Sequence, residues 1–437
     1  MDSIKTQEAD IFPCQDRLDN GLTVVTVEMP HWHSVELGVF VRAGLRMESP
    51  GTNGISHFLE HMLFRGNRAF PDSLSLNREF ESIGRDLRAS THSEYTFYGF
   101  SPYAPNLDRA VELLGLFFDQ PTFPSLEVER EIILEECQED LNEKGEMINI
   151  NNLACRLLYP GHPLSWPVIG TEATIRALKV SDLRRYFETF YHPANMVLVG
   201  AGALHHARFL ELARRCFTFD RPAGRTVTSE WFHVEERQTG PQTLFQEDPD
   251  NQLQIQVCFR GISYRHPDFF ALLLINRMFD DGVCSRLQRV LREERGLVYS
   301  VENRATSWTD TGTFDFDVQV RPEKTEAVLD ILFAEIKRFL TEGPDQAELD
   351  HVRRRYLMDL ELELDDPIKQ IDRYGFSNLY SRPLSIDQER ERVEAVRLED
   401  IRRVASRILC REGLNVVLVG RVSETLKRQV ERLADAF

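Results

Sequence analysis

The sequence predicts an α+β protein made of two tandem homologous domains, each an α/β sandwich. Its length, 437 residues, exceeds what a single hydrophobic core usually organises. Its second half also repeats patterns of the first: the apolar run 195–200 recurs as 415–420, and the alternating run 35–41 recurs as 253–259, each roughly 220 residues later. A duplicated unit that mixes strands with helices predicts two similar sandwiches rather than one continuous sheet.

The expected domain boundaries follow from where the apolar periodicity stops. Between residues 219 and 242, Pro, Gly, Thr and charged residues replace the apolar patterns. We therefore expect an N-terminal domain at residues 1–222, a linker at 223–240 and a C-terminal domain at 241–437.

The elements of the first half can be placed from the spacing of apolar residues, which is two in strands and three to four in helices. In chain order they are strands at 22–27 and 35–41, a helix at 55–64, a strand at 95–100, helices at 107–118, 126–143 and 181–190, and a strand at 195–200. Asn53 and Gly66 flank the first helix as a favoured N-cap and a favoured helix stop. In the second half, 398–403 matches 180–185 and Ala327 matches Ala110, so we expect the same order of elements there.

The first expected helix carries the pattern His57-x-x-Glu60-His61. The two histidines lie one turn apart on one helix face, with the glutamate beside them. Two imidazoles at this spacing can hold one Zn²⁺, and a carboxylate can take a proton from a water at the metal. This order of residues is one of the zinc-peptidase signatures. By itself it also fits a half-buried helix without a metal.

The duplication argues that this trio is specialised. At the repeat offset the corresponding positions are Ile275, Met278 and Phe279, which are all apolar. Since the second half packs its equivalent helix without polar residues, the scaffold does not need them. The polar trio therefore points to a function that only the first half has.

Composition excludes several classes of function. The formal net charge of -18 disfavours nucleic acid, whose binding depends on Lys and Arg neutralising phosphates. No apolar run approaches the roughly 18 residues that span a bilayer, so we expect no membrane partner. Residues 1–10 lack the apolar core of a signal peptide and the Arg-rich character of a transit peptide. Seven cysteines, an odd number without CxxC spacing, favour the reducing cytoplasm.

Several stretches together resemble the pitrilysin family of zinc metallopeptidases, the inverzincins. They are residues 18–25, 54–62, 129–136, 162–164 with 170–172, and 295–301. The resemblance covers essentially the whole chain and points to the short branch with mitochondrial processing peptidase β subunits and bacterial homologues. It implies half of a clamshell peptidase, a zinc metalloendopeptidase that hydrolyses extended or unfolded peptides inside a closed chamber. Processing of a leader or presequence and breakdown of short unfolded peptides look alike at this level.

The resemblance also implies one Zn²⁺ per chain and a third ligand, a glutamate well downstream of the second histidine. Glu136 stands at that place in the matched segment, and Glu129 corresponds to a second glutamate that supports the site. Glu60 would act as general base on the attacking water. The adjacent Glu135 remains the alternative ligand, because helix registers inferred from sequence are uncertain by a residue. We expect Cys137 to be a small buried residue.

The resemblance further implies that the substrate adds as a strand to an exposed sheet edge. The expected edge is 88–95, with Arg88, Ala89, Ser90 and Thr91 as substrate-binding residues. The family usually has Asn where this chain has Arg88, so the chain departs from the family in substrate contact and not at the metal.

Arg292 and Tyr299 match an Arg–Tyr pair that in this family reaches the substrate from the half opposite the zinc. There the pair would donate hydrogen bonds to the oxyanion that develops during attack. A chain that is only half of a clamshell implies a homodimer in which each pair completes the other chain's site, or a heterodimer with an inactive paralogue. The plainer interpretation makes Arg292 a surface helix residue and Tyr299 a core aromatic.

The alternative for the whole chain is a non-catalytic pitrilysin-like partner or structural subunit. Such subunits typically lose members of the signature. This chain keeps all four residues of the set, which are His57, Glu60, His61 and Glu136.

Overall fold

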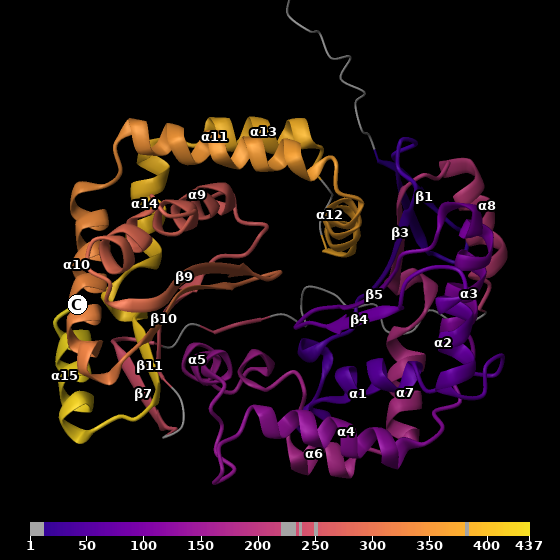
Figure 1. Ribbon diagram of the computed structural model, residues 1–437, viewed down its shortest axis with the longest axis horizontal. Coiled ribbons are helices and arrows are strands. Elements are labelled where there is room, and N and C mark those ends of the chain that lie inside the picture. The colour runs from indigo at the N-terminus through magenta and orange to yellow at the C-terminus, as the bar shows by residue number, and fades with distance from the viewer. Residues whose placement is uncertain (1–12, 220–232, 236–237, 249–251, 381–383) are drawn as a thin grey trace, which may run out of the picture.

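The computed structural model describes residues 13–219, 233–235, 238–248, 252–380 and 384–437. The N-terminal segment discussed above and most of the expected linker 223–240 lie outside these residues, so the linker and the domain boundaries stay predictions. The described part of the chain forms two halves, each built around its own sheet (Figure 1). Among the described helices, none is long and apolar enough to cross a lipid bilayer.

The first half is a six-stranded sheet in the order β1-β2-β6-β3-β5-β4. Its strands are β1 (Cys14–Arg17), β2 (Thr23–Glu28), β3 (Val35–Val41), β4 (Arg88–Thr91), β5 (Thr96–Phe100) and β6 (Met196–Gly202). The strands β3 and β6 are buried along their whole length, as their continuous apolar sequences require. The helices of this half are α1 (Ile55–Leu63), α2 (Ser73–Glu81), α3 (Leu107–Phe118), α4 (Leu126–Glu139), α5 (Ile150–Leu158), α6 (Glu172–Ala177), α7 (Val180–Phe190) and α8 (His206–Cys216).

The second half repeats this topology with five strands in the order β7-β11-β8-β10-β9. Its strands are β7 (Gln242–Glu247), β8 (Leu253–Gly261), β9 (Val298–Ser307), β10 (Gly312–Val320) and β11 (Asn415–Gly420). Its helices are α9 (Phe269–Phe279), α10 (Thr325–Glu342), α11 (Gln346–Glu363), α12 (Pro367–Tyr380), α13 (Ile386–Ala395), α14 (Leu398–Ile408) and α15 (Glu424–Asp435). The parallel pair β7–β11 and the antiparallel pairs β11–β8, β8–β10 and β10–β9 reproduce the pairing of β2–β6–β3–β5–β4. The predicted fold class, two tandem homologous sandwiches, is confirmed.

The two halves exchange a helix, which the sequence did not predict. The helix α5, from the first half, packs on β8 and β11 of the second sheet, and Leu153 and Leu158 join Val417 in one core cluster. In return α12 packs on β3 and β6 of the first sheet, where Ile371 and Tyr374 belong to the first core (Figure 1). Each sheet is therefore covered in part by a helix from the other half.

The helix α4 ends earlier than its charge pattern predicts, at Glu139 instead of 143. The chain turns there because the Asn142 side chain accepts hydrogen bonds from the backbone N–H of Lys144 (3.0 Å) and Glu146 (3.0 Å). Gly145 takes a left-handed φ of 75° in the same turn, a conformation that glycine adopts without strain.

Candidate metal centre

The helix α1 places His57 and His61 side by side, with ring centroids 4.5 Å apart. Glu136 reaches them from α4: its Oε2 lies 3.8 Å from His57 Nε2 and 3.7 Å from His61 Nε2. Two atoms bound to the same Zn²⁺ at about 2.0–2.2 Å each can be at most about 4.4 Å apart, so both distances fit a shared ion. Among the described residues, this trio is the only group of three His, Cys, Asp or Glu side chains close enough to hold a metal.

The chemistry of these donors also fits zinc. Burial, with the charge of the neighbouring His61, lowers the pKa of His57 to about 3, so its imidazole is neutral and free to ligate. Two nitrogens and one carboxylate oxygen are a known ligand set for catalytic zinc, which leaves one position for water or substrate. The neighbour Glu135 is exposed, whereas Glu136 is half-buried beside the histidines.

A carboxylate from outside the motif fixes the orientation of His61. Glu129, one to two turns before Glu136 on α4, has its Oε1 2.8 Å from His61 Nδ1. The Nε of Arg65 donates to the other oxygen of Glu129. Burial would raise the pKa of Glu129, but the hydrogen bonds from His61 and Arg65 outweigh it and lower the pKa. An ionised Glu129 keeps the proton of His61 on Nδ1 and leaves Nε2 for a metal.

Glu60 lies beside the trio without joining it. Its side chain is 8% exposed and accepts a hydrogen bond from the Thr91 hydroxyl. Burial raises the pKa of Glu60, and the hydrogen bond from Thr91 only partly opposes this shift. A carboxylate with a raised pKa is a stronger base, which suits proton abstraction from water.

The N-terminus of α1 is capped differently from the prediction. Asn53 does not cap the helix: its side-chain amide donates to the Pro167 carbonyl (2.9 Å) and to Glu48 (3.0 Å), and Gly54 takes the N-cap position with φ 90°. The buried Glu48 carboxylate accepts from the backbone N–H of Gly54 (2.8 Å) and Ser56 (3.0 Å) instead. Gly66 follows the last turn but does not end the helix, whose C-cap is Phe64. Glu48, nine residues before His57, gave no signal in the sequence, and neither did Arg65.

The expected substrate edge is an edge of the first sheet, because among the described strands β4 pairs only with β5. Its side chains divide between two faces. Thr91 points to α1 and Glu60. Ala89, which pairs with Tyr98 on β5, shares that face because it lies two residues before Thr91. Arg88 points the other way and donates to Glu36 (3.1 Å) and Ser101 (3.0 Å).

The guanidinium of Arg88 is surrounded by residues of its own sheet. The guanidinium of Arg88 passes over Gly99, where a Cβ would lie 2.9 Å from the Nε of Arg88. The positive charge of Arg88 compensates the negative charge of the buried Glu36. Ser90, on the same face, bonds to His92 Nε2 (2.9 Å). The side chains of Arg88 and Ser90 are thus hydrogen-bonded within the chain, and β4 is the last strand of the described sheet.

Arg292 and Tyr299 lie in the second half and are not brought to the metal trio. Arg292 is exposed on a short π-helical turn (Gln288–Glu293), and Tyr299 is 77% exposed on β9. This exposure excludes the interpretation of Tyr299 as a core aromatic. A π-helical turn is rare and is often found at functional sites.

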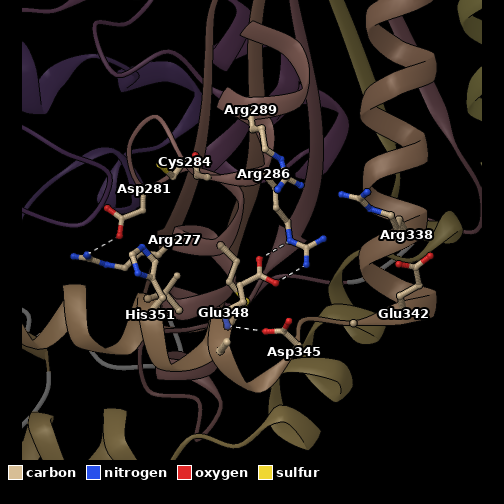
Figure 2. A pocket seen from close by; sticks show the side chains of 15 residues that line it. Arg277, Asp281, Cys284, Arg286, Arg289, Arg338, Glu342, Asp345, Glu348 and His351 are labelled. Carbon is tan, nitrogen blue, oxygen red and sulfur yellow. Dashed lines mark hydrogen bonds and ion pairs between the residues drawn. The ribbon is translucent and has the colours of Figure 1, made fainter. Parts of the chain in front are cut away.

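The second half also has a cavity of about 590 Å³ between α9, α10 and the start of α11, far from α1 in the sequence (Figure 2). Its lining carries both signs of charge, and several of these side chains form ion pairs with each other or with Glu335 next to the cavity. Arg286 donates two hydrogen bonds to Glu348 (2.6 and 2.5 Å) and one to Glu335 (2.9 Å). Arg338 forms an ion pair with Glu335 (2.6 Å). The cavity therefore offers no strong surplus of one charge to a ligand.

Comparisons with known proteins place both halves in one family. Residues 23–171 match the model described as insulinase (peptidase family M16), and residues 177–356 match the model of the peptidase M16 inactive domain. An uncharacterised zinc protease of Streptomyces coelicolor is 27% identical, over 96% of this chain and 91% of its own length. The mitochondrial-processing peptidase subunit beta of Lentinula edodes is 27% identical over 93% of this chain and 89% of its own length.

Solved structures share the fold at lower identity. A protease from Helicobacter pylori superposes with a TM-score of 0.87 at 20% identity, over 94% of this chain and 99% of that one. The periplasmic protease PqqL from Escherichia coli gives a TM-score of 0.77 at 19% identity, over 97% of this chain but 50% of that one. The fold of this chain thus makes up almost all of the Helicobacter chain and about half of the longer PqqL chain.

Proposed function

Because the chain belongs to the insulinase family of peptidases, family M16, we propose that it is a zinc-dependent endopeptidase that hydrolyses extended or unfolded peptides. The observation that carries this proposal is the meeting of His57, His61 and Glu136 at ion-sharing distances, with Glu60 beside them. A catalytically inactive chain would not require a buried carboxylate next to a complete set of three metal ligands.

In the proposed reaction, His57, His61 and Glu136 would hold one Zn²⁺ per chain. Bound zinc would supply Lewis-acid polarisation of the scissile carbonyl and lower the pKa of water. Glu60 takes the proton of the attacking water and returns it to the leaving amine. Thr91 fixes the direction of the Glu60 carboxylate by its hydrogen bond, and Glu129 fixes the ring of His61.

The proposed substrate site is the free backbone edge of β4. A peptide added there as a strand would gain main-chain hydrogen bonds irrespective of its sequence. Thr91 ends this strand and contacts Glu60, so a peptide bound along the edge would lie close to the proposed base. This arrangement favours extended or unfolded segments over folded proteins.

We further propose that two such chains pair to close a chamber. The name of the Lentinula relative describes a subunit, and PqqL is twice as long as the region this chain matches, so a second half is expected. A homodimer is the simplest source, with Arg292 and Tyr299 of each chain directed at the other chain's zinc site. An inactive paralogue in a heterodimer is the second candidate. Leader-peptide processing and cytoplasmic location stay predictions.

The alternative function, a non-catalytic partner subunit, is favoured by the description of the model for residues 177–356 as an inactive domain. That domain lies mostly in the second half of the chain, where apolar residues stand at the positions that correspond to the metal-binding trio. The alternative and the proposal differ in what the purified chain does.

The experiment is metal analysis combined with hydrolysis of a quenched, unstructured peptide. We expect about one zinc per chain, loss of cleavage on treatment with a chelator, and recovery with stoichiometric Zn²⁺. His57→Ala, which removes one ligand, is the matched control and should lose both metal and cleavage. A chain that binds no zinc contradicts the proposal, and a zinc-loaded chain without cleavage favours the partner-subunit function.

A further inference from the structure

We propose that the turn between β9 and β10 (Trp308–Thr311), in the second half, is a positioning element for the substrate edge β4 in the first half. The inference rests on the proposed function, because it assigns that turn to the peptide site around Glu60. It concerns four residues that make one contact between the halves, Arg46, Glu94, Thr309 and Asp310, which we call the interdomain clamp.

Glu94 is the centre of the clamp. It lies in the turn between β4 and β5 and is 1% exposed. Its two oxygens accept from the backbone N–H of Thr309 (3.1 and 3.2 Å), and Oε2 also accepts from the Thr309 hydroxyl (3.0 Å). A buried carboxylate is stable only where such donors replace its water. The second half therefore supplies most of the hydrogen bonds that allow this carboxylate to be buried.

Arg46 closes the clamp from the first half. Its side chain is fully buried, and its Nη1 donates to Glu94 Oε1 (2.8 Å) and to Asp310 Oδ1 (2.7 Å). One guanidinium thus bridges a carboxylate of each half. The Arg46–Glu94 pair is buried, whereas Asp310 is partly exposed. A buried ion pair contributes little net stability but imposes one geometry, because removing one partner leaves a buried charge.

The clamp acts on β4 through the turn that joins it to β5. Backbone N–H groups of Leu45 and Arg46 donate to the carbonyls of His92 (3.2 Å) and Ser93 (2.8 Å). Gly44 packs so closely that a Cβ there would lie 2.3 Å from the His92 carbonyl oxygen. On the opposite side, the hydroxyl of Tyr380, at the end of α12, donates to the Glu94 carbonyl. The turn is held on both sides, so the position of β4 follows the position of the second half.

The site needs this support because β4 is short and held along one side only. It has four residues and pairs with β5 alone in the part of the chain that the structure describes, which leaves its other edge for a substrate. Its last residue, Thr91, donates to Glu60 and is three residues from Glu94. A displaced turn would move both the hydrogen-bonding edge and the partner of the proposed base. Thr309 and Asp310 are thus positioning residues, which act through Glu94 and β4.

The test changes the second-half side of the clamp only. Thr309→Val removes the hydroxyl donor, and Thr309→Val with Asp310→Asn also removes the charge facing Arg46. Thr306→Val is the matched control, since Thr306 is exposed on the same hairpin. Three quantities are measured in the zinc-loaded protein: amide hydrogen exchange of residues 88–95, the zinc dissociation constant, and kcat and KM for the quenched peptide.

We expect both clamp variants to speed exchange in 88–95 by about tenfold or more, with exchange in α1 and α9 unchanged. The zinc dissociation constant should stay within about twofold, while KM rises about fivefold or more with a smaller change in kcat, because uniform binding at the edge is lost. If the double variant does not fold, the single Thr309→Val carries the test, since it leaves every carboxylate of the clamp paired.

Two results would overturn the inference. One is unchanged exchange in 88–95 in a folded variant. The other is faster exchange spread equally over both halves, which would mean a loss of global stability and no positioning. Failure of the proposed function is recognised separately, because a chain that binds no zinc would fail before any variant is made, while the exchange measurement would still report on the clamp.

Discussion

Glu60 is the residue on which the proposed chemistry depends most directly. It is buried beside the ligand trio, yet it contacts Thr91 and is not one of the metal-sharing side chains. Glu60→Gln keeps the size and the hydrogen bond to Thr91 but removes the proton acceptor. We expect cleavage to fall by about 10²–10⁴-fold with zinc content unchanged, as measured by turnover and metal analysis. Near-normal turnover would remove the role of base from Glu60.

The choice between Glu135 and Glu136 is a second prediction for single residues. Only Glu136 faces the histidines, because neighbouring positions on a helix point about 100° apart. Glu136→Gln should weaken zinc binding sharply, since an amide oxygen is a poorer ligand than a carboxylate, while Glu135→Gln, the matched control, should leave it unchanged. Zinc titration against a competing chelator measures both. Loss of zinc in the Glu135 variant would refute the assignment.

Arg88 shows what residue-level inference from sequence missed. Its place on the edge strand was predicted, and β4 is that edge. The direction of its side chain depends on the buried Glu36 and on the space above Gly99, which come from β3 and β5. The substrate role of Arg88 stays a prediction, and the structure shows that its guanidinium is hydrogen-bonded to Glu36 and Ser101 within the chain.

At the scale of elements, the exchange of α5 and α12 makes the two sandwiches interdependent. The contact of α12 with the first sheet is tight at Gly375, where a Cβ would lie 2.0 Å from the ring of Phe40 on β3. The Phe40 ring is itself buried and packed against Phe97 at 4.8 Å, so it cannot move away easily. The close approach of helix and strand thus needs glycine at this position.

Gly375→Ala should lower the free energy of unfolding by about 1–3 kcal/mol through overpacking. Because each sheet carries a helix from the other half, both sheets should unfold at the same, lower denaturant concentration. Urea unfolding followed by circular dichroism and by hydrogen exchange of β3 and β8 measures this. Gly51→Ala is the control, since a Cβ there meets open space, and should change the free energy by less than about 0.5 kcal/mol. Separate transitions for the two sheets would contradict the interdependence.

At the scale of the whole molecule, the open question is what Arg292 and Tyr299 do, because neither joins the metal trio of its own chain. In the proposed homodimer they complete the partner's site as donors to the oxyanion. A Glu60→Gln chain and a Tyr299→Phe chain should each be nearly inactive. Mixed under conditions that exchange subunits, they should regain part of the activity, because one site of each mixed dimer is then intact.

The control for this experiment is a mixture of Glu60→Gln with His57→Ala, in which every mixed dimer has two inactive catalytic sites: one lacks the base and the other lacks a metal ligand. That mixture should stay inactive. Proven subunit exchange without recovery in the Glu60→Gln and Tyr299→Phe mixture would refute the shared site. Activity of the Glu60→Gln and Tyr299→Phe mixture no higher than that of the control mixture would also refute the shared site.

The sequence by itself determined the features that depend on local periodicity. The one-turn spacing of His57 and His61 and the helix Leu107–Phe118 follow from residues close together in the chain. The doubled order of elements follows from comparing the two halves of the sequence, whose patterns repeat. The choice of Glu136 and the pairing of Glu129 with His61 came from the family resemblance, and the geometry agrees with the placement of both side chains.

Only the tertiary structure decided how distant segments meet. The bond from Asn53 to Pro167, the bond from Thr91 to Glu60, the exchange of α5 and α12, and the clamp from Thr309 to Glu94 join residues far apart in the sequence. The reason is physical. The secondary structure of a residue is set largely by its neighbours in the sequence. The contact partner of its side chain depends instead on which buried polar groups and apolar surfaces come together when the two halves pack.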